Sequence, residues 1–152
     1  MKRFNVLTGD LDHQSVRAGY RWRGARGVGE RLGAERIGAS VFELEDGELS
    51  FPYHFHHGVE EWLYVIAGSP SVRTPGGERL LQAGDLVCFP TGPEGSHTVR
   101  GPGRVMMVSA NQVPSISVYP DSGKLGTRPA PAGSEDRLNF RRADAVDYWE
   151  GE

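Results

Sequence analysis

Short apolar runs separated by turn residues make up the hydrophobic pattern of this chain. Residues 62–66, Trp-Leu-Tyr-Val-Ile, combine aromatic and β-branched side chains, which are typical of a β-strand. Residues 105–110 form a nearly continuous apolar run, which predicts a strand buried on both faces. The same signals predict further strands at residues 36–45, 49–56, 86–89, 97–100 and 115–119.

Glycine, proline and aspartate mark the connections between these strands. Asp46-Gly47 is a strong hairpin signal, and Pro75-Gly76-Gly77 predicts a second hairpin within residues 71–82. Residues 120–137 contain three prolines among glycines, serines and charged residues, which predicts a loop or a mobile linker. The pattern therefore favours many short strands over a helical bundle.

Length and composition favour a single all-β domain. A chain of 152 residues can bury a real core, and its 21 glycines and 10 prolines suit strands joined by tight turns. We expect residues 1–33 to be an N-terminal arm and loop that pack on a β-barrel. Residues 34–119 would form the barrel core, and residues 120–152 a loop and C-terminal tail that dock on the barrel or on a partner subunit.

Charge and cysteine content exclude several classes of protein. The net charge is −3 and the chain has no dense basic block, so we expect no nucleic-acid partner. No apolar stretch approaches the ~20 residues of a membrane-spanning helix, and no apolar run follows the first three residues. Cys88 is the one cysteine, which excludes an intrachain disulfide and fits a cytoplasmic location. We expect its side chain to be a small core residue.

Three histidines and a carboxylate form the candidate functional site. Residues i and i+2 of a strand point to the same face, so His54 and His56 can close on one metal ion. Glu61 begins the next predicted strand after a short connection, which brings a carboxylate to the same place. His97, on a distant predicted strand, would be the fourth ligand of a closed site.

Two positions beside this set stay open. Adjacent strand residues face opposite sides, so only one of Glu60 and Glu61 can reach the metal, and residues 62–66, which are apolar on both faces, do not decide which. His57 is out of phase with His54 and His56. It would pack on the outer face or form a hydrogen bond with a residue that surrounds the site. The alternative is that His57 takes the place of one of the proposed ligands.

The two histidine-containing stretches resemble the two motifs of the cupin superfamily. Together they cover about a third of the chain and supply every ligand type of that family. The sequence departs from the family pattern at three points: one extra residue before the first histidine, two extra residues before the last histidine, and a glycine at position 101 where the pattern has asparagine. The matching residues are Gly47, His54, His56, Glu61 and Gly68 in the first motif and Gly84, Pro90, Gly92 and His97 in the second. In the first motif, the spacing to Gly68 favours Glu61 over Glu60 as the ligand.

The resemblance implies an all-β double-stranded β-helix, that is, a jelly-roll (cupin) barrel wide enough for one small molecule. If Glu61, Leu63 and Val65 face inward, the outer face carries Trp62, Tyr64 and Ile66. This face is too apolar for water. Members of the family commonly pair through such a face, so a homodimer is expected.

Three imidazoles and one carboxylate suit a divalent transition metal ion, namely Fe, Mn, Ni, Zn or Cu, without choosing among them. An octahedral ion would keep two positions for water or substrate. The resemblance therefore implies a small metal-dependent enzyme, a dioxygenase or an isomerase/lyase, acting on a small oxygenated molecule in the barrel. The alternative is a non-catalytic cupin that binds a small molecule or metal as a sensor or storage protein, because this fold hosts many functions.

Residues beyond the ligands are less well defined by the sequence. Tyr53, His57 and Tyr64 are the candidates for a general acid or base. Residues 17–33 hold five arginines among glycines. They are either a solvated loop lying on the barrel or an arginine-lined rim for an anionic substrate.

Overall fold

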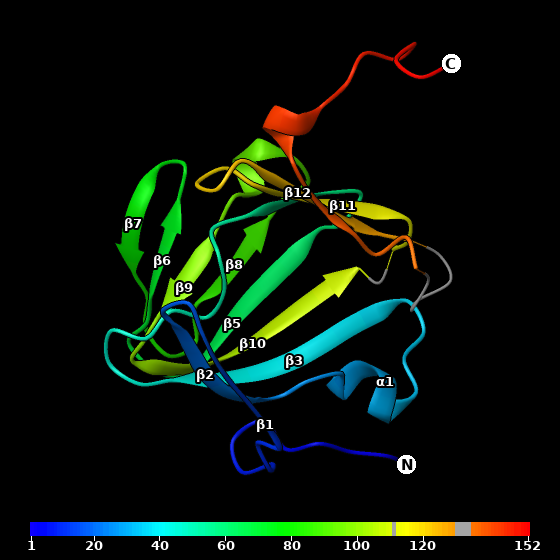
Figure 1. The fold of residues 1–152 in the computed structure, drawn as a ribbon. Helices are drawn as coiled ribbons and strands as arrows, with labels where there is room; N and C mark the ends of the chain where they lie inside the picture. Colours follow the sequence, from blue (N-terminus) through cyan, green and yellow to red (C-terminus); the bar gives the residue numbers. More distant parts are fainter. Residues whose placement is uncertain (111, 130–134) are drawn as a thin grey trace.

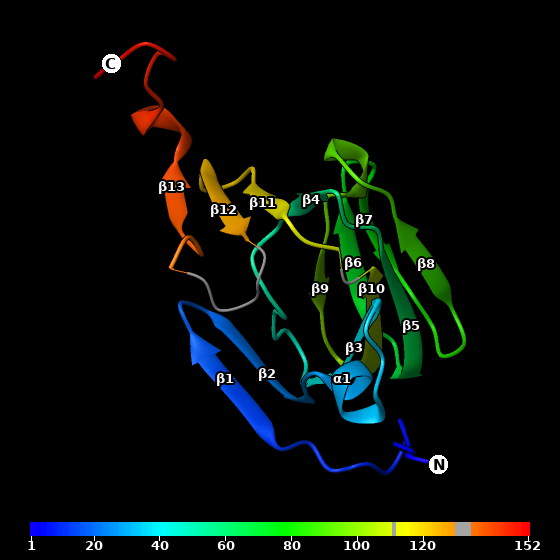
Figure 2. The same cartoon turned by 90° about the vertical axis from the view of Figure 1, so that its right-hand side faces the viewer.

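Two antiparallel layers of β-strands face each other and enclose the core in the computed structural model, which describes residues 1–110, 112–129 and 135–152 (Figures 1 and 2). One layer is a six-stranded sheet with the order β1-β2-β3-β10-β5-β8. The other contains a four-stranded sheet, β13-β12-β11-β4, and a three-stranded sheet, β7-β6-β9. An isolated bridge between His54 and His97 joins these two smaller sheets. This all-β jelly-roll architecture confirms the predicted fold class.

The elements have the following bounds: β1 His13–Arg17, β2 Tyr20–Ala25, α1 Val28–Leu32, β3 Ile37–Leu44, β4 Phe55–His57, β5 Glu61–Gly68, β6 Ser71–Thr74, β7 Gly77–Leu80, β8 Leu86–Phe89, β9 Thr98–Arg100, β10 Gly103–Ala110, β11 Ser115–Tyr119, β12 Lys124–Arg128 and β13 Asn139–Arg141, with short 3₁₀ turns at Pro93–Gly95 and Arg142–Asp144.

The core lies between the layers and is built on β5 and its partner β10. Leu63 pairs with Met107 and Val65 with Val105 across these strands, and all four side chains point inward, as period-2 alternation requires. Leu63 and Val65 are 0% exposed. The core is completed by buried side chains from the other strands, among them Phe42, Leu44, Val72, Phe89 and Val99.

The predicted strands of the central region are present, with two local corrections. Asp46-Gly47 forms a turn in which Gly47 has a φ of 74°. It is not a hairpin, because β3 pairs with β2 and β10 and not with the segment that follows. Of the predicted strand at residues 49–56, only the end is regular: β4 is Phe55–His57.

The flanking segments contain more regular structure than the sequence predicts. Most of the arginine-rich stretch is no loop, because β1 and β2 form a hairpin and β2 pairs with β3. Within the predicted linker at residues 120–137, β12 pairs with β11 across a tight turn. Cross-strand pairing overrides the weak local signal of glycine-rich sequence in both places. Residues 130–134 of this predicted linker lie outside the described part of the chain.

Cys88 is a further correction, because its side chain is exposed and is not part of the core. β8 is the edge strand of the six-stranded sheet, and Cys88 pairs with Trp62, which lies on the outer face. Partial desolvation of the thiol, followed by the charge of Glu60, raises the pKa of Cys88.

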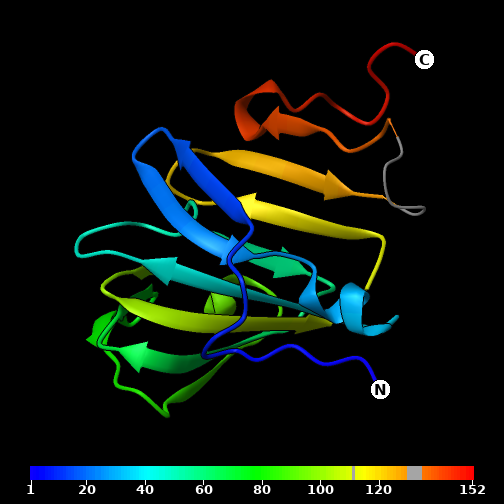
Figure 3. The same cartoon turned by 90° about the horizontal axis from the view of Figure 1, so that it is seen from below.

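The C-terminal residues leave the barrel after β13 and extend away from it (Figures 1 and 3). Val146, Tyr148 and Trp149 are 65%, 83% and 72% exposed. The docking of this tail and the three-part division of the chain stay predictions. None of the helices in the described residues has the length and apolar character needed to span a membrane, and the expected cytoplasmic location stays a prediction.

Candidate metal centre

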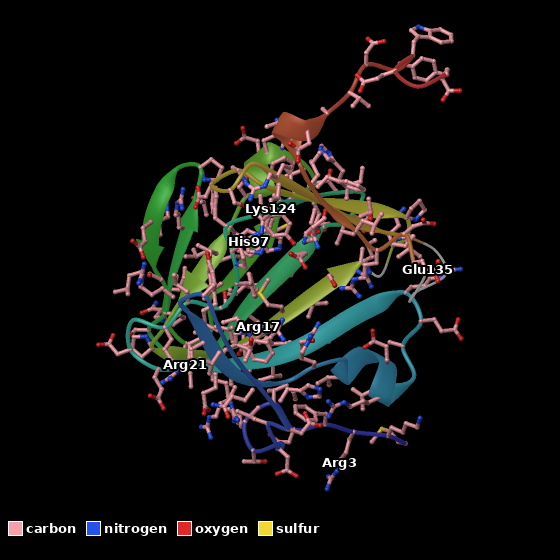
Figure 4. All side chains as sticks on the ribbon, in the orientation of Figure 1. Arg3, Arg17, Arg21, His97, Lys124 and Glu135 are labelled. Atoms are coloured by element: carbon pink, nitrogen blue, oxygen red, sulfur yellow. The ribbon has the colours of Figure 1, made fainter. Side chains whose placement is uncertain are left out.

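The candidate site forms where the two smaller sheets meet, on the inside of the barrel (Figure 4). The backbones of His54 and His97 exchange two hydrogen bonds, with N–O distances of 3.1 and 2.8 Å. His56 follows in β4, on the same side as His54, which is the i, i+2 relation that a strand provides. Glu61 is the first residue of β5, in the opposite layer. The tertiary structure thus brings together all four predicted ligands.

The Glu61 carboxylate is at the centre of the group. Its Oε2 atom lies 3.3 Å from His56 Nε2, 3.4 Å from His97 Nε2 and 4.0 Å from His54 Nε2. Donor atoms that share one ion at about 2.1 Å lie about 3.0 to 3.5 Å apart at octahedral to tetrahedral angles. The observed spacing therefore suits a metal ion after a small adjustment.

Each histidine is held by its other ring nitrogen. His54 Nδ1 lies 2.9 Å from the Pro52 carbonyl oxygen, and His97 Nδ1 lies 2.8 Å from that of Gly95. A carbonyl accepts, so both Nδ1 atoms donate, which leaves an acceptor lone pair on Nε2. His56 Nδ1 is 3.0 Å from the Ser117 hydroxyl oxygen. Metal-binding histidines in proteins are oriented by such contacts.

His97 provides the clearest sign that a ligand belongs here. Its side chain is 1% exposed and its ring stacks on Phe89, with 3.8 Å between the centroids and 4° between the planes. Its Nε2 atom is buried and has no hydrogen-bond partner among the described residues. An unpaired buried nitrogen is costly, and a metal ion would satisfy it. The residues present thus fit a divalent metal ion.

Protonation also favours metal binding. Burial, together with the neighbouring rings of His97 and His56, lowers the pKa of His54 to about 3, and burial lowers the pKa of His97. Burial by itself would raise the pKa of Glu61, but the hydrogen bond from His56, together with the interactions with the His56, His97 and His54 rings, lowers it. Neutral imidazole and ionised carboxylate are the forms that bind metal ions.

The alternatives at neighbouring positions lie elsewhere. Glu60 is exposed and accepts a hydrogen bond from Trp62 Nε1 at 2.9 Å. His57 is exposed and contacts Phe55 edge to face, with 5.3 Å between the ring centroids. Among the described residues, His54, His56 and Glu61 form a group that could hold a metal, with donor atoms within 4.8 Å of one another.

The two tyrosine candidates are not at this site. Tyr53 is buried under the guanidinium of Arg73, which lies 4.0 Å from the centre of the ring. Tyr64 pairs with Met106 and Leu86 on the outer face of the six-stranded sheet. Neither residue lines the cavity into which the histidines open.

That cavity has a volume of about 680 Å³, within the usual range for a small-molecule site. Its wall combines three of the candidate ligands, His54, His56 and Glu61, with hydroxyl and amide groups from both layers, namely Ser40, Ser109, Ser117, Tyr119, Thr127 and Asn139. Such a lining suits a molecule with several oxygen atoms. The cavity wall therefore offers hydrogen-bonding groups next to the candidate metal ligands and is not purely apolar.

Tyr119 is the functional candidate that the sequence analysis missed. Its ring stacks on His54, with 5.8 Å between the centroids and 22° between the planes, and it lines the cavity. The ammonium of Lys124 lies 5.3 Å from the centre of the Tyr119 ring. The alternation of residues 115–119 places Tyr119 on the same face as Ser117, but only the tertiary structure shows that this face looks toward His54.

Of the five arginines in residues 17–33, Arg26 is the one that lines the cavity. The guanidinium groups of Arg21, Arg23 and Arg31 form ion pairs with Glu48, Glu43 and Asp12. Arg17 ends β1 and Arg21 lies in β2, so both belong to the β1–β2 hairpin (Figure 4). Arg26 is therefore the residue of this segment that lies where the rim interpretation requires, and its role in binding an anion stays a prediction.

Comparison with known proteins supports the same fold. The family model described as "Cupin domain" matches residues 40–111. A sugar phosphate isomerase from Silicibacter pomeroyi superimposes with a TM-score of 0.78 at 19% identity, covering 95% of each chain. A candidate sugar phosphate isomerase from Acidithiobacillus ferrooxidans gives 0.74 at 21% identity, over 88% of this chain and 86% of the other.

The polyketide cyclase RemF from Streptomyces resistomycificus is a more distant match, with a TM-score of 0.57 at 24% identity over 76% of this chain and 83% of the cyclase. No protein of curated function matches the chain in sequence. At these identities the solved structures share the fold with this chain.

Proposed function

We propose that this chain, which belongs to the cupin superfamily as a small cupin-domain protein, is a metal-dependent enzyme of the isomerase or lyase type. It would act on a small molecule that carries a carbonyl group and several hydroxyl groups. The observation that carries the proposal is the convergence of three oriented histidines and Glu61 at one end of an oxygen-lined cavity.

The proposed ligands are His54, His56, Glu61 and His97. A divalent ion held by them would polarise a substrate carbonyl and acidify the adjacent carbon. The donor set accepts Fe, Mn, Ni, Zn or Cu. Backbone carbonyls and Ser117 keep the rings oriented before any ion arrives, so little reorganisation is needed on binding.

Tyr119 is the proton carrier in this proposal. An isomerisation of this kind removes a proton from the carbon beside the carbonyl and returns one to the former carbonyl carbon, while a hydroxyl proton moves between the two oxygens. The Tyr119 ring stacks on His54, so its phenol lies beside the candidate metal ligands. Ser117 on β11 and Asn139 on β13 both pair with Gly126 of the intervening β12, and they would bind the hydroxyl groups of the substrate.

Sugar phosphates are the first substrate class to test. They are the class named for two solved structures that share this fold over most of their length. They combine a carbonyl group with several hydroxyl groups, which is the chemistry that the cavity lining would bind.

We expect the metal-loaded protein to incorporate solvent deuterium into one member of a panel of aldose and ketose phosphates. Tyr119→Phe should lower the rate of incorporation by about 100-fold, because general acid–base groups contribute about that much or more. Its metal content should stay equal to that of the wild type. Proton NMR in D₂O measures exchange, and elemental mass spectrometry measures the metal.

Tyr53→Phe is the matched control, since Tyr53 lies under Arg73 outside the cavity. Equal exchange rates in the Tyr119→Phe variant and the wild type would remove Tyr119 from the mechanism. Consumption of oxygen in place of deuterium exchange would point to the dioxygenase alternative. Metal binding without any turnover would favour the non-catalytic sensor or storage protein.

We further propose that two copies pair through the outer face of the six-stranded sheet. Trp62 is 41% exposed and Leu86 is 58% exposed there, and Tyr64 lies between them. Such an exposed apolar face on a sheet is typical of an interface. Light scattering at micromolar concentration should give about twice the mass of the 16.6 kDa chain, and Leu86→Glu should shift the protein toward the monomer. A monomeric wild type would contradict this proposal.

A further inference from the structure

The charged side chains of the cavity are divided between its buried end and its mouth. The buried end carries the candidate metal ligands, of which His54 is 9% exposed. Three arginines line the cavity, namely Arg26, Arg128 and Arg137, and Arg26 and Arg137 are exposed. Two other titratable groups line it away from the ligands: Glu30 and His13, whose ring contacts Asp12 at 2.8 Å. Arginine therefore outweighs carboxylate at the mouth.

These arginines come from separate parts of the chain. Arg26 lies between β2 and α1, Arg128 ends β12, and Arg137 precedes β13. Figure 1 shows α1 and the end of β12 at the same side of the barrel, on the right. The two sheets thus bring positive charge to one opening from both layers.

Arg26 and Arg137 differ from the six arginines of the described residues that form ion pairs. Those six guanidinium groups have carboxylate partners, as in the Arg73–Asp121 pair at 2.7 Å and the Arg104–Glu43 pair at 3.3 Å. Within the described ranges, neither Arg26 nor Arg137 has a carboxylate oxygen within 4.0 Å. Two unpaired guanidiniums facing one cavity would attract an anion and bind it through paired hydrogen bonds.

We infer that this mouth is a binding site for the anionic end of the substrate, a phosphate or carboxylate group, with Arg26 and Arg137 as its principal ligands. This inference rests on the proposed function, because it orients the molecule in the proposed active site. The anion would sit at the arginines while the carbonyl end reaches the buried histidines. The cavity would thereby select molecules that carry an anionic group at one end and a carbonyl group at the other, with a length that matches the span between the arginines and the histidines.

Binding measurements test this inference separately from turnover. We would titrate fructose, fructose 6-phosphate, gluconate and inorganic phosphate into the metal-loaded protein by isothermal calorimetry. Fructose 6-phosphate or gluconate should bind at least tenfold more tightly than fructose. The double variant Arg26→Gln/Arg137→Gln should lose that preference, because each charged hydrogen bond contributes about tenfold or more. Its metal content should be unchanged.

Arg79→Gln is the matched control. Arg79 is an exposed arginine on β7, which lies on the other side of the barrel in Figure 1. This variant should keep the preference of the wild type. The phosphate and gluconate arms distinguish a phosphate group from a carboxylate.

The inference is overturned if none of the anions binds more tightly to the wild type than to the Arg26→Gln/Arg137→Gln variant. Metal binding and deuterium exchange on a neutral sugar would then leave the proposed function standing. Conversely, anion binding that depends on both arginines, in a protein that takes up no metal, would keep the anion site and remove the metal-dependent enzyme.

Discussion

The double variant His54→Ala/His56→Ala is expected to lose essentially all of the metal that the wild-type protein binds. The two rings account for half of the proposed ligand set, and their Nε2 atoms lie 4.0 and 3.3 Å from Glu61 Oε2. The remaining pair, Glu61 and His97, would leave too few protein ligands for tight binding. Elemental mass spectrometry of untagged protein after reconstitution measures the loss against near-stoichiometric metal in the wild type.

His57→Ala is the control for this result, because His57 is the adjacent histidine in the chain and is exposed outside the cluster. It should keep the full metal content. Glu61→Gln should weaken metal binding, while Glu60→Gln should not, since Glu60 contacts Trp62. Metal retained in the double variant, or lost in the His57 variant, would place the site elsewhere.

The second large effect concerns the core. Leu63→Ala is expected to lower the free energy of unfolding by about 3 kcal/mol, the typical cost of removing a buried leucine and leaving a cavity. Leu63 is 0% exposed and belongs to the core cluster between the two layers. It also lies two residues after Glu61, so the loss of packing affects the strand that positions the carboxylate. Urea denaturation of the metal-free protein, followed by tryptophan fluorescence, measures the change.

Leu80→Ala provides the comparison, because Leu80 is a strand leucine that is 75% exposed. Its substitution should change the free energy of unfolding by less than about 0.5 kcal/mol. Similar values for the two variants would mean that the interior between β5 and β10 contributes less to stability than its burial indicates.

Local chemistry in the sequence was sufficient for the strands around the site. The run at residues 62–66 and the apolar run at 105–110 carry strong β signals. Their local preference therefore agrees with the strand pairing that the structure contains. The two-residue period of a strand likewise fixes that His54 and His56 point the same way. Each of these predictions depends only on residues that are close in the chain. In the structure, residues 62–66 lie in β5, residues 105–110 lie in β10, and His54 forms the bridge just before β4.

The sequence signal was weakest where pairing partners are distant. The hairpin of β1 and β2 and the strand β12 are built from glycine, arginine and polar residues, and they form strands because β3 and β11 offer free edges. Which loop arginines line the cavity also depends on this pairing. Arg26 lies just past the end of β2, whereas Arg21 and Arg23 lie within it.

The sequence by itself thus determined the all-β class and the common direction of His54 and His56, since strand periodicity is a local property. The set of four proposed ligands, with Glu61 in place of Glu60, came from the resemblance to the cupin motifs and stays a prediction. Only the tertiary structure decided that Tyr119 lies beside His54, that Tyr53 and Tyr64 do not line the cavity, and that Arg26 and Arg137 both line it. The physical reason is that these relations join residues far apart in the chain. They depend on how the two layers pack and on which strand edges pair, and no short stretch of sequence contains that information.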